Sequence, residues 1–108
     1  MFTANKSQNR SRLLDGAKLV ASAGTPVPVS ATPVLLETVE LFGQKARGTN
    51  NTGLVYVGAN PAVNTQLRPL SAGGSLVLVA PVGRKLDLSQ LFIDAVTNGD
   101  GVTYLAIE

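Results

Sequence analysis

Short apolar runs, separated by clusters of Gly, Pro and Asn, fill the chain from Thr25 onward. The breaks recur about every 8–12 residues, a spacing typical of antiparallel sandwiches and barrels. No helical period of useful length follows residue 25, and no repeat of fixed length is visible. The pattern predicts an all-β domain over residues 25–108, a β-sandwich of jelly-roll or Ig-like type with about seven or eight strands.

The run 35–42 shows the clearest alternation of apolar and polar residues. Val39 and Leu41 alternate with Thr38 and Glu40, so we expect one face of this strand to be buried and the other to be wet. Leu36 is out of phase with Val39. This shift indicates a bulge or other interruption between the two residues.

Other runs predict where their strands lie. The prolines of segment 25–30 place it at the edge of a sheet. The runs 54–58 and 75–80 are apolar on both faces, so each is expected to be central or covered by a partner. The cluster 98–101, with sequence Asn-Gly-Asp-Gly, predicts a hairpin turn before a last strand over 102–107.

Residues 1–24 differ from the rest and are interpreted as an N-terminal extended arm. They are polar up to Arg12 and rich in small residues near Gly24. A short helix is expected inside the arm, with Ser11 as its N-cap. Its apolar positions are Leu13, Leu14, Ala17, Leu19 and Val20. Two alternatives stay open: a leader without fixed structure, or an arm that becomes ordered on a neighbouring subunit.

Charge divides the chain in the same way. Charged residues make up 15% of the sequence, below the roughly 25% of ordinary soluble domains, which suits a subunit inside an assembly. The net charge is +2; residues 1–18 hold four bases against one acid, and the remainder five against six. A nearly neutral domain without a basic stripe argues against nucleic-acid binding.

The residue types needed for common catalysis are scarce. The sequence contains no His and no Cys, which excludes the usual triads and zinc sites. Asp94 precedes the predicted last turn and Asp100 lies within it; both are interpreted as residues that support this turn. We expect no enzyme activity and no cofactor. No apolar run approaches the roughly 20 residues of a membrane span, and the absence of Cys suits synthesis in the cytosol.

Five segments together resemble small virion structural proteins of tailed bacteriophages. The resemblance covers roughly residues 35–107 and leaves the arm outside. It is carried by Val39-Glu40-Leu41, by the Asn-Thr-Gly-Leu-Val-Tyr-Val-Gly run at 51–58, and by 70–76, 87–94 and 99–104. It implies a β-sandwich scaffold and, most closely, a capsid decoration (cement) protein; head-fibre and tail components look similar at this level.

The function expected is therefore non-enzymatic. The protein would bind the capsid exterior and bridge neighbouring subunits of the major capsid protein, after synthesis in the host cytoplasm. A homotrimer is favoured, with a dimer as the alternative. The partner-binding residues predicted are the basic ones of the arm and of one turn: Lys6, Arg10, Arg12, Lys18, Arg84 and Lys85.

The runner-up function is a carbohydrate- or receptor-binding module. Tyr56 and Tyr104 are the aromatic residues that would stack on a sugar. An exposed aromatic in a polar groove would favour this module, whereas a flat apolar face would favour the structural protein.

Overall fold

The computed structural model describes residues 12–108. This part of the chain folds into twelve strands and one turn of 3₁₀ helix, η1. The elements in chain order are β1 (Leu13–Leu19), β2 (Val27–Pro28), β3 (Leu35–Leu36), β4 (Thr38–Phe42), β5 (Gln44–Ala46), β6 (Thr49–Asn50), β7 (Val55–Gly58), β8 (Arg68–Leu70), β9 (Ser75–Val79), β10 (Leu86–Asp87), η1 (Leu88–Gln90), β11 (Phe92–Ala95) and β12 (Gly101–Ile107).

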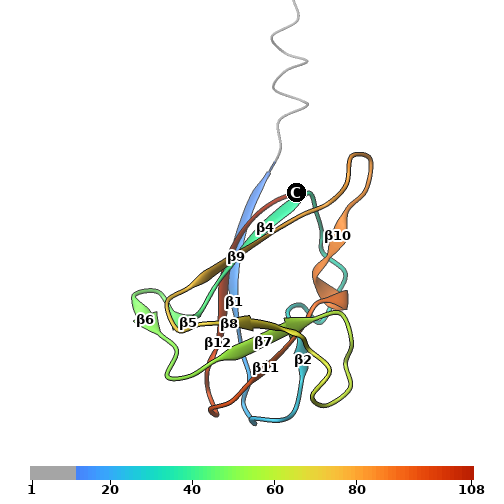
Figure 1. The fold of residues 1–108 in the computed structure, drawn as a ribbon. Helices are drawn as coiled ribbons and strands as arrows, with labels where there is room; N and C mark the ends of the chain where they lie inside the picture. Colours follow the sequence, from blue (N-terminus) through green and yellow to red (C-terminus); the bar gives the residue numbers. More distant parts are fainter. Residues whose placement is uncertain (1–11) are drawn as a thin grey trace, which may run out of the picture.

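Two four-stranded antiparallel sheets make up most of the structure (Figure 1). One has the strand order β1-β12-β4-β9, and the other has the order β2-β11-β7-β8. Two short pairs, β3 with β10 and β5 with β6, lie beside them. The all-β sandwich predicted from the sequence is confirmed.

The core consists of inward-facing side chains from both sheets. Val39 and Leu41 of β4 are fully buried, while their neighbours Thr38 and Glu40 are only half-buried, so the predicted alternation is confirmed. The other buried apolar residues are Val20, Val29, Leu36, Val55, Val57, Leu70, Leu88, Ile93, Ala95, Val102 and Ala106. One contiguous cluster therefore joins the two sheets.

Residues 13–19 form a strand, and the predicted helix is wrong. β1 pairs along its whole length with β12, from Leu13 opposite Ile107 to Leu19 opposite Gly101. Val20, next in the chain, is fully buried in the core. The predicted arm of residues 1–24 thus includes an edge strand of the domain, and residues 1–11 lie outside the described part.

The other expectations have mixed outcomes. β2 lies at a sheet edge and β7 lies inside a sheet, as predicted from segments 25–30 and 54–58. The interruption expected after Leu36 falls at Glu37, where the chain leaves the β3–β10 pair and enters the large sheet. β9, in contrast, is an edge strand with one face uncovered.

The cluster 98–101 is not the turn of a hairpin. It connects β11 to β12, and these strands belong to different sheets. Asp100 is fully buried, and its carboxylate accepts hydrogen bonds from the backbone N–H groups of Thr52 (3.0 Å) and Gly53 (2.9 Å). The side chain of Asn51 donates to the carbonyl of Gly101 (2.7 Å) and accepts from its N–H (3.0 Å). These hydrogen bonds thus hold the segments 51–53 and 99–101 against each other.

Candidate protein-binding face

Alternate residues of the β1-β12-β4-β9 sheet point away from the core, and the strand register aligns them in rows. We call this surface the outer face. The first row is Leu13, Ile107, Thr38 and Val79; the second is Asp15, Leu105, Glu40 and Val77; the third is Ala17, Thr103, Phe42 and Ser75. The rows are invisible in the sequence because each one joins four distant strands.

The outer face is unusually apolar for a surface of the molecule. Leu13 is 70% exposed, Val79 67% and Val77 53%. Leu105 and Ile107 are also exposed. A two-layer sandwich normally carries polar residues on its wet faces, and a group of exposed apolar side chains on one face marks an interaction surface.

Two carboxylates interrupt this apolar surface. Asp15 and Glu40 flank Leu105 in the second row. Within residues 12–108, neither makes an ion pair with a basic side chain. The middle of the outer face is therefore both apolar and acidic.

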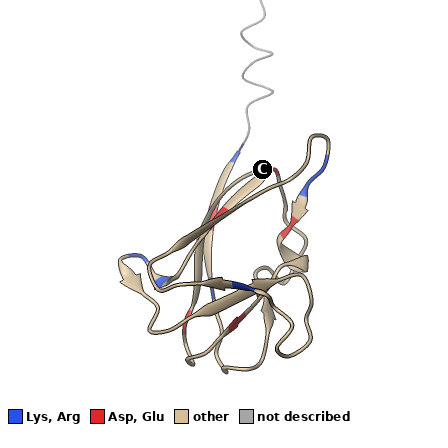
Figure 2. Cartoon of the chain, in the orientation of Figure 1, with Lys and Arg blue, Asp and Glu red and all other residues tan. Residues whose placement is uncertain are grey.

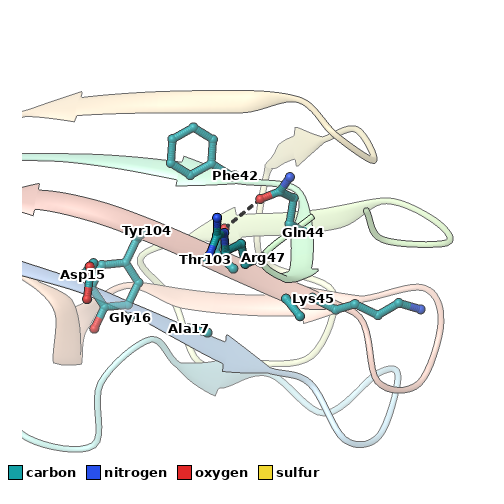
Figure 3. Close-up of a pocket in the computed structure, with 10 residues that line it drawn as sticks. Asp15, Gly16, Ala17, Phe42, Gln44, Lys45, Arg47, Thr103 and Tyr104 are labelled. Atoms are coloured by element: carbon teal, nitrogen blue, oxygen red, sulfur yellow. Dashed lines mark hydrogen bonds between the residues drawn. The ribbon is translucent and has the colours of Figure 1, made fainter. Parts of the chain in front are cut away.

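The β5–β6 hairpin bounds the outer face beyond the third row. β5 lies against β12 and β1, and the Thr103 hydroxyl donates to Gln44 Oε1 at 3.3 Å. A shallow hollow of about 680 Å³ is left beside β5 (Figure 3), lined by Asp15, Gly16, Ala17, Phe42, Gln44, Lys45, Ala46, Arg47, Thr103 and Tyr104. The hollow combines an apolar aromatic side chain with two basic ones, so it fits a protruding group of a partner better than a catalytic role.

The predicted partner-binding residues divide into three groups. Lys6 and Arg10 lie outside the described residues. Arg12 pairs with Glu108 (Nε to Oε1, 3.0 Å) and Lys85 with Glu37 (Nζ to Oε2, 3.4 Å). Such exposed pairs add little stability. The start of β1, next to Arg12, and the turn after β9, which carries Arg84 and Lys85, lie at the same end of the molecule (Figure 2).

Lys18 does not join this group. It pairs with Val102 and stands six residues from Arg12 along an extended strand, a separation of about 20 Å. Val82 was not among the partner-binding residues predicted from the sequence, but it is fully exposed in the turn beside Arg84. Its position in a basic turn was visible in the sequence, but its exposure was not.

The other sheet carries a small polar pocket. The connection from β7 to β8 packs against the sheet: a Cβ atom at Gly58 would lie 2.8 Å from the Cα of Gln66. The pocket, of about 270 Å³, is lined by Tyr56, Asn64, Gln66 and Asp94. Gln66 Oε1 is buried without a hydrogen-bond partner among the described residues.

Tyr104 is placed differently from Tyr56. Its ring covers Gly16 in the adjacent strand, where an added Cβ would lie 2.5 Å from the tyrosine oxygen. The side chain also packs against the core. Tyr104 therefore supports the packing of β1 against β12, although it also lines the hollow beside β5, whereas Tyr56 lines the small polar pocket.

Asp94 and Asp87 accept hydrogen bonds that hold the fold together. Asp94 Oδ1 accepts hydrogen bonds from the N–H groups of Gly24 (2.9 Å) and Ala95 (2.8 Å). Hydrogen bonds from the backbone N–H and hydroxyl of Ser89 hold the pKa of Asp87 below its ordinary value of 3.8. In the part of the chain that the structure describes, no three His, Cys, Asp or Glu residues cluster as metal ligands would.

Comparison of the chain with protein-family models, curated proteins and solved structures finds no match. Within residues 12–108, no helix has the length and apolar character that a membrane crossing needs.

Proposed function

We propose that the protein is a capsid decoration protein that acts by binding other protein subunits. The observation that supports this role is the apolar outer face of the β1-β12-β4-β9 sheet. An exposed apolar face is unfavourable for an isolated domain and is explained when the domain works inside an assembly. A cement protein needs no covalent chemistry, because simultaneous contacts with two or more subunits resist their separation.

The strand order supports a jelly roll over an Ig-like sandwich. Among the eight strands of the two large sheets, only β7 and β8 follow each other within one sheet; the other six connections cross between the sheets. An Ig-like domain keeps several consecutive strands in the same sheet. Jelly rolls recur in viral capsid and lectin domains, so this topology fits both the virion role and its runner-up.

We place the capsid contact at the end that carries Arg12 and the 81–85 turn. Arg84 and Lys85 supply positive charge there, and the exposed Val82 supplies an apolar tip. Charges of this kind steer association and fix register more than they add affinity.

Sedimentation of the purified protein with bare capsids tests the proposal. The intact chain should pellet with capsids, and the double variant Arg84→Ser/Lys85→Ser should attach more slowly. Its attachment should also depend less on salt, because exposed charges are screened within about 8 Å at physiological ionic strength. The control is Arg68→Ser, which removes a positive charge from the exposed edge strand β8 of the other sheet. Absence of the intact chain from the pellet at every salt concentration would refute the proposed function.

The polar pocket supports carbohydrate binding as the second candidate function. Tyr56, Asn64 and Asp94 offer an aromatic ring, an amide and a carboxylate within one hollow. Titration with monosaccharides, followed by the NMR shifts of residues 56, 64 and 94, tests this function. Shifts that saturate and disappear in Tyr56→Ala would favour it over the structural role.

A further inference from the structure

The outer face calls for a covering partner of defined chemistry. That partner must be apolar, to match Leu13, Val77 and Val79, and basic, to match Asp15 and Glu40. The same face of a second copy does not meet this condition. A symmetric face-to-face pair would bring the central carboxylates of both copies together, and like charges across an interface are unfavourable.

Residues 1–11 of the chain have the required chemistry. They contain Lys6 and Arg10 and no acidic residue. Phe2 adds an aromatic side chain. Charge complementarity therefore favours this segment as the cover of the outer face.

The position of Arg12 favours the outer face of another copy, rather than the chain's own, as the surface that residues 1–11 bind. The Arg12 carbonyl accepts a hydrogen bond from the Glu108 N–H (2.9 Å), so the pairing of β1 with β12 extends to Arg12. The described part of the chain thus begins at the end of the sheet, beyond its first row. To reach its own outer face, the segment would have to reverse direction directly before Arg12.

Residues 1–11 are long enough to reach the outer face of a neighbouring copy. Eleven extended residues reach about 36–40 Å, whereas the three rows of the outer face span only about 13 Å. The segment therefore exceeds the face by more than 20 Å, which leaves enough chain to bridge two neighbouring molecules.

We propose that residues 1–11 of one copy bind across the outer face of a neighbouring copy, with Lys6 and Arg10 beside Asp15 and Glu40. This contact between copies adds to the proposed function. It rests on that function only for the statement that the assembled copies sit on a capsid. The contact joins two different surfaces, so it is heterologous and forms a closed ring when the rotation between copies permits. The trimer expected from the sequence is one such ring.

Sedimentation velocity of the purified protein, without capsids, tests the charge pairing. Both Lys6→Glu/Arg10→Glu and Asp15→Lys/Glu40→Lys should weaken self-association by about tenfold or more. The two pairs combined in one chain should restore it, because the charges are exchanged rather than removed. Arg68→Glu, on the edge strand β8 of the other sheet, is the control. A monomeric intact chain, or association that persists unchanged in both double variants, overturns the inference.

Cross-linking identifies the copy that receives the segment. The sequence has no native Cys, so a chain with both Lys6→Cys and Glu40→Cys reports a single contact. Oxidation should give disulfide-linked oligomers, and the control with Lys6→Cys and Arg68→Cys should not. A disulfide within one chain, or no disulfide above the control, overturns the inference. Capsid binding is measured separately, so failure of the exchange and failure of the proposed function remain distinguishable.

Discussion

Asn51 and Asp100 show how two buried polar side chains determine the junction between the sheets. Asn51 presents its amide to Gly101 as another strand would, with one donor and one acceptor. Asp100 accepts from two backbone N–H groups and lies 3.7 Å from Lys45 Nζ. Buried polar groups of this kind are favourable only while every partner is present.

Replacing Asn51 with Ala should therefore destabilise the domain. The N–H and C=O of Gly101 would be left buried without partners, at about 1–3 kcal/mol for each group. The loss is measured as the free energy of unfolding in urea. Asn50→Ala is the matched control, since Asn50 is exposed and accepts only a 3.4 Å hydrogen bond from Gln44. Equal losses in the two variants would contradict a structural role for Asn51.

Asp87 should make stability depend on pH. Its pKa is lowered in the folded state, first by the Ser89 N–H, then by the Ser89 hydroxyl and the Val34 N–H. A carboxyl with a depressed pKa contributes stability above its unfolded pKa, and that contribution is lost as the pH falls through the folded value. The Tm difference between the intact chain and Asp87→Asn should be largest near pH 7 and should shrink below about pH 4. A Tm difference that stays constant from pH 7 to below pH 4 would contradict this role of Asp87.

β1 is the element that sequence reasoning misassigned, and the reason is physical. Leu14, Ala17 and Val20 suit one side of a helix, and short apolar segments carry no decisive period. Pairing with β12 decides the outcome, but a partner 90 residues away is not visible locally. In contrast, β4 and β2 were predictable, because the alternation around Val39 and the prolines of segment 25–30 act within a few residues.

The same limit applies to the connections and to the candidate site. The turn chemistry at 98–101 predicts a reversal of the chain, but not which sheet the next strand joins. The outer face depends on the register of four strands, so only the apolar second face of β9 was foreseen. Arg84 and Lys85 could be assigned to a turn from the sequence; their shared end with Arg12 required the fold.

The strand pairing of β1 predicts different results for two truncations. Deleting residues 2–10 should leave the free energy of unfolding of the monomer nearly unchanged, because β1 begins at Leu13. Deleting residues 2–18 should lower it by about 3 kcal/mol or more, because Leu14 no longer packs against the core and β12 keeps only β4 as a neighbour. If residues 1–24 formed an arm outside the sandwich, both deletions would leave its stability unchanged. Thermal unfolding of both chains checks the difference, and equal Tm values would contradict it.

At the scale of the whole molecule, the two sheets differ in what they expose to solvent. The β1-β12-β4-β9 sheet presents apolar rows to its surroundings, whereas the other sheet is partly covered by the connection from β7 to β8. In an assembly built on this fold, the outer face would therefore be the side that binds neighbouring molecules. The basic end with Arg12 and Arg84 lies along the edge of that side, which is compatible with contacts to neighbours and capsid at once.

The pairing of β1 with β12 and of β2 with β11 has a consequence for synthesis. Both sheets join strands from opposite ends of the chain, so one sheet is complete only after β11 has left the ribosome and the other only after β12 has. Such long-range topologies fold slowly, in roughly milliseconds to seconds. A nascent chain stalled before Gly101 should remain sensitive to protease, and one stalled after Ile107 has cleared the exit tunnel should become resistant. Folding is thus expected to follow the synthesis of β12, which delays formation of the outer face until the whole domain is made.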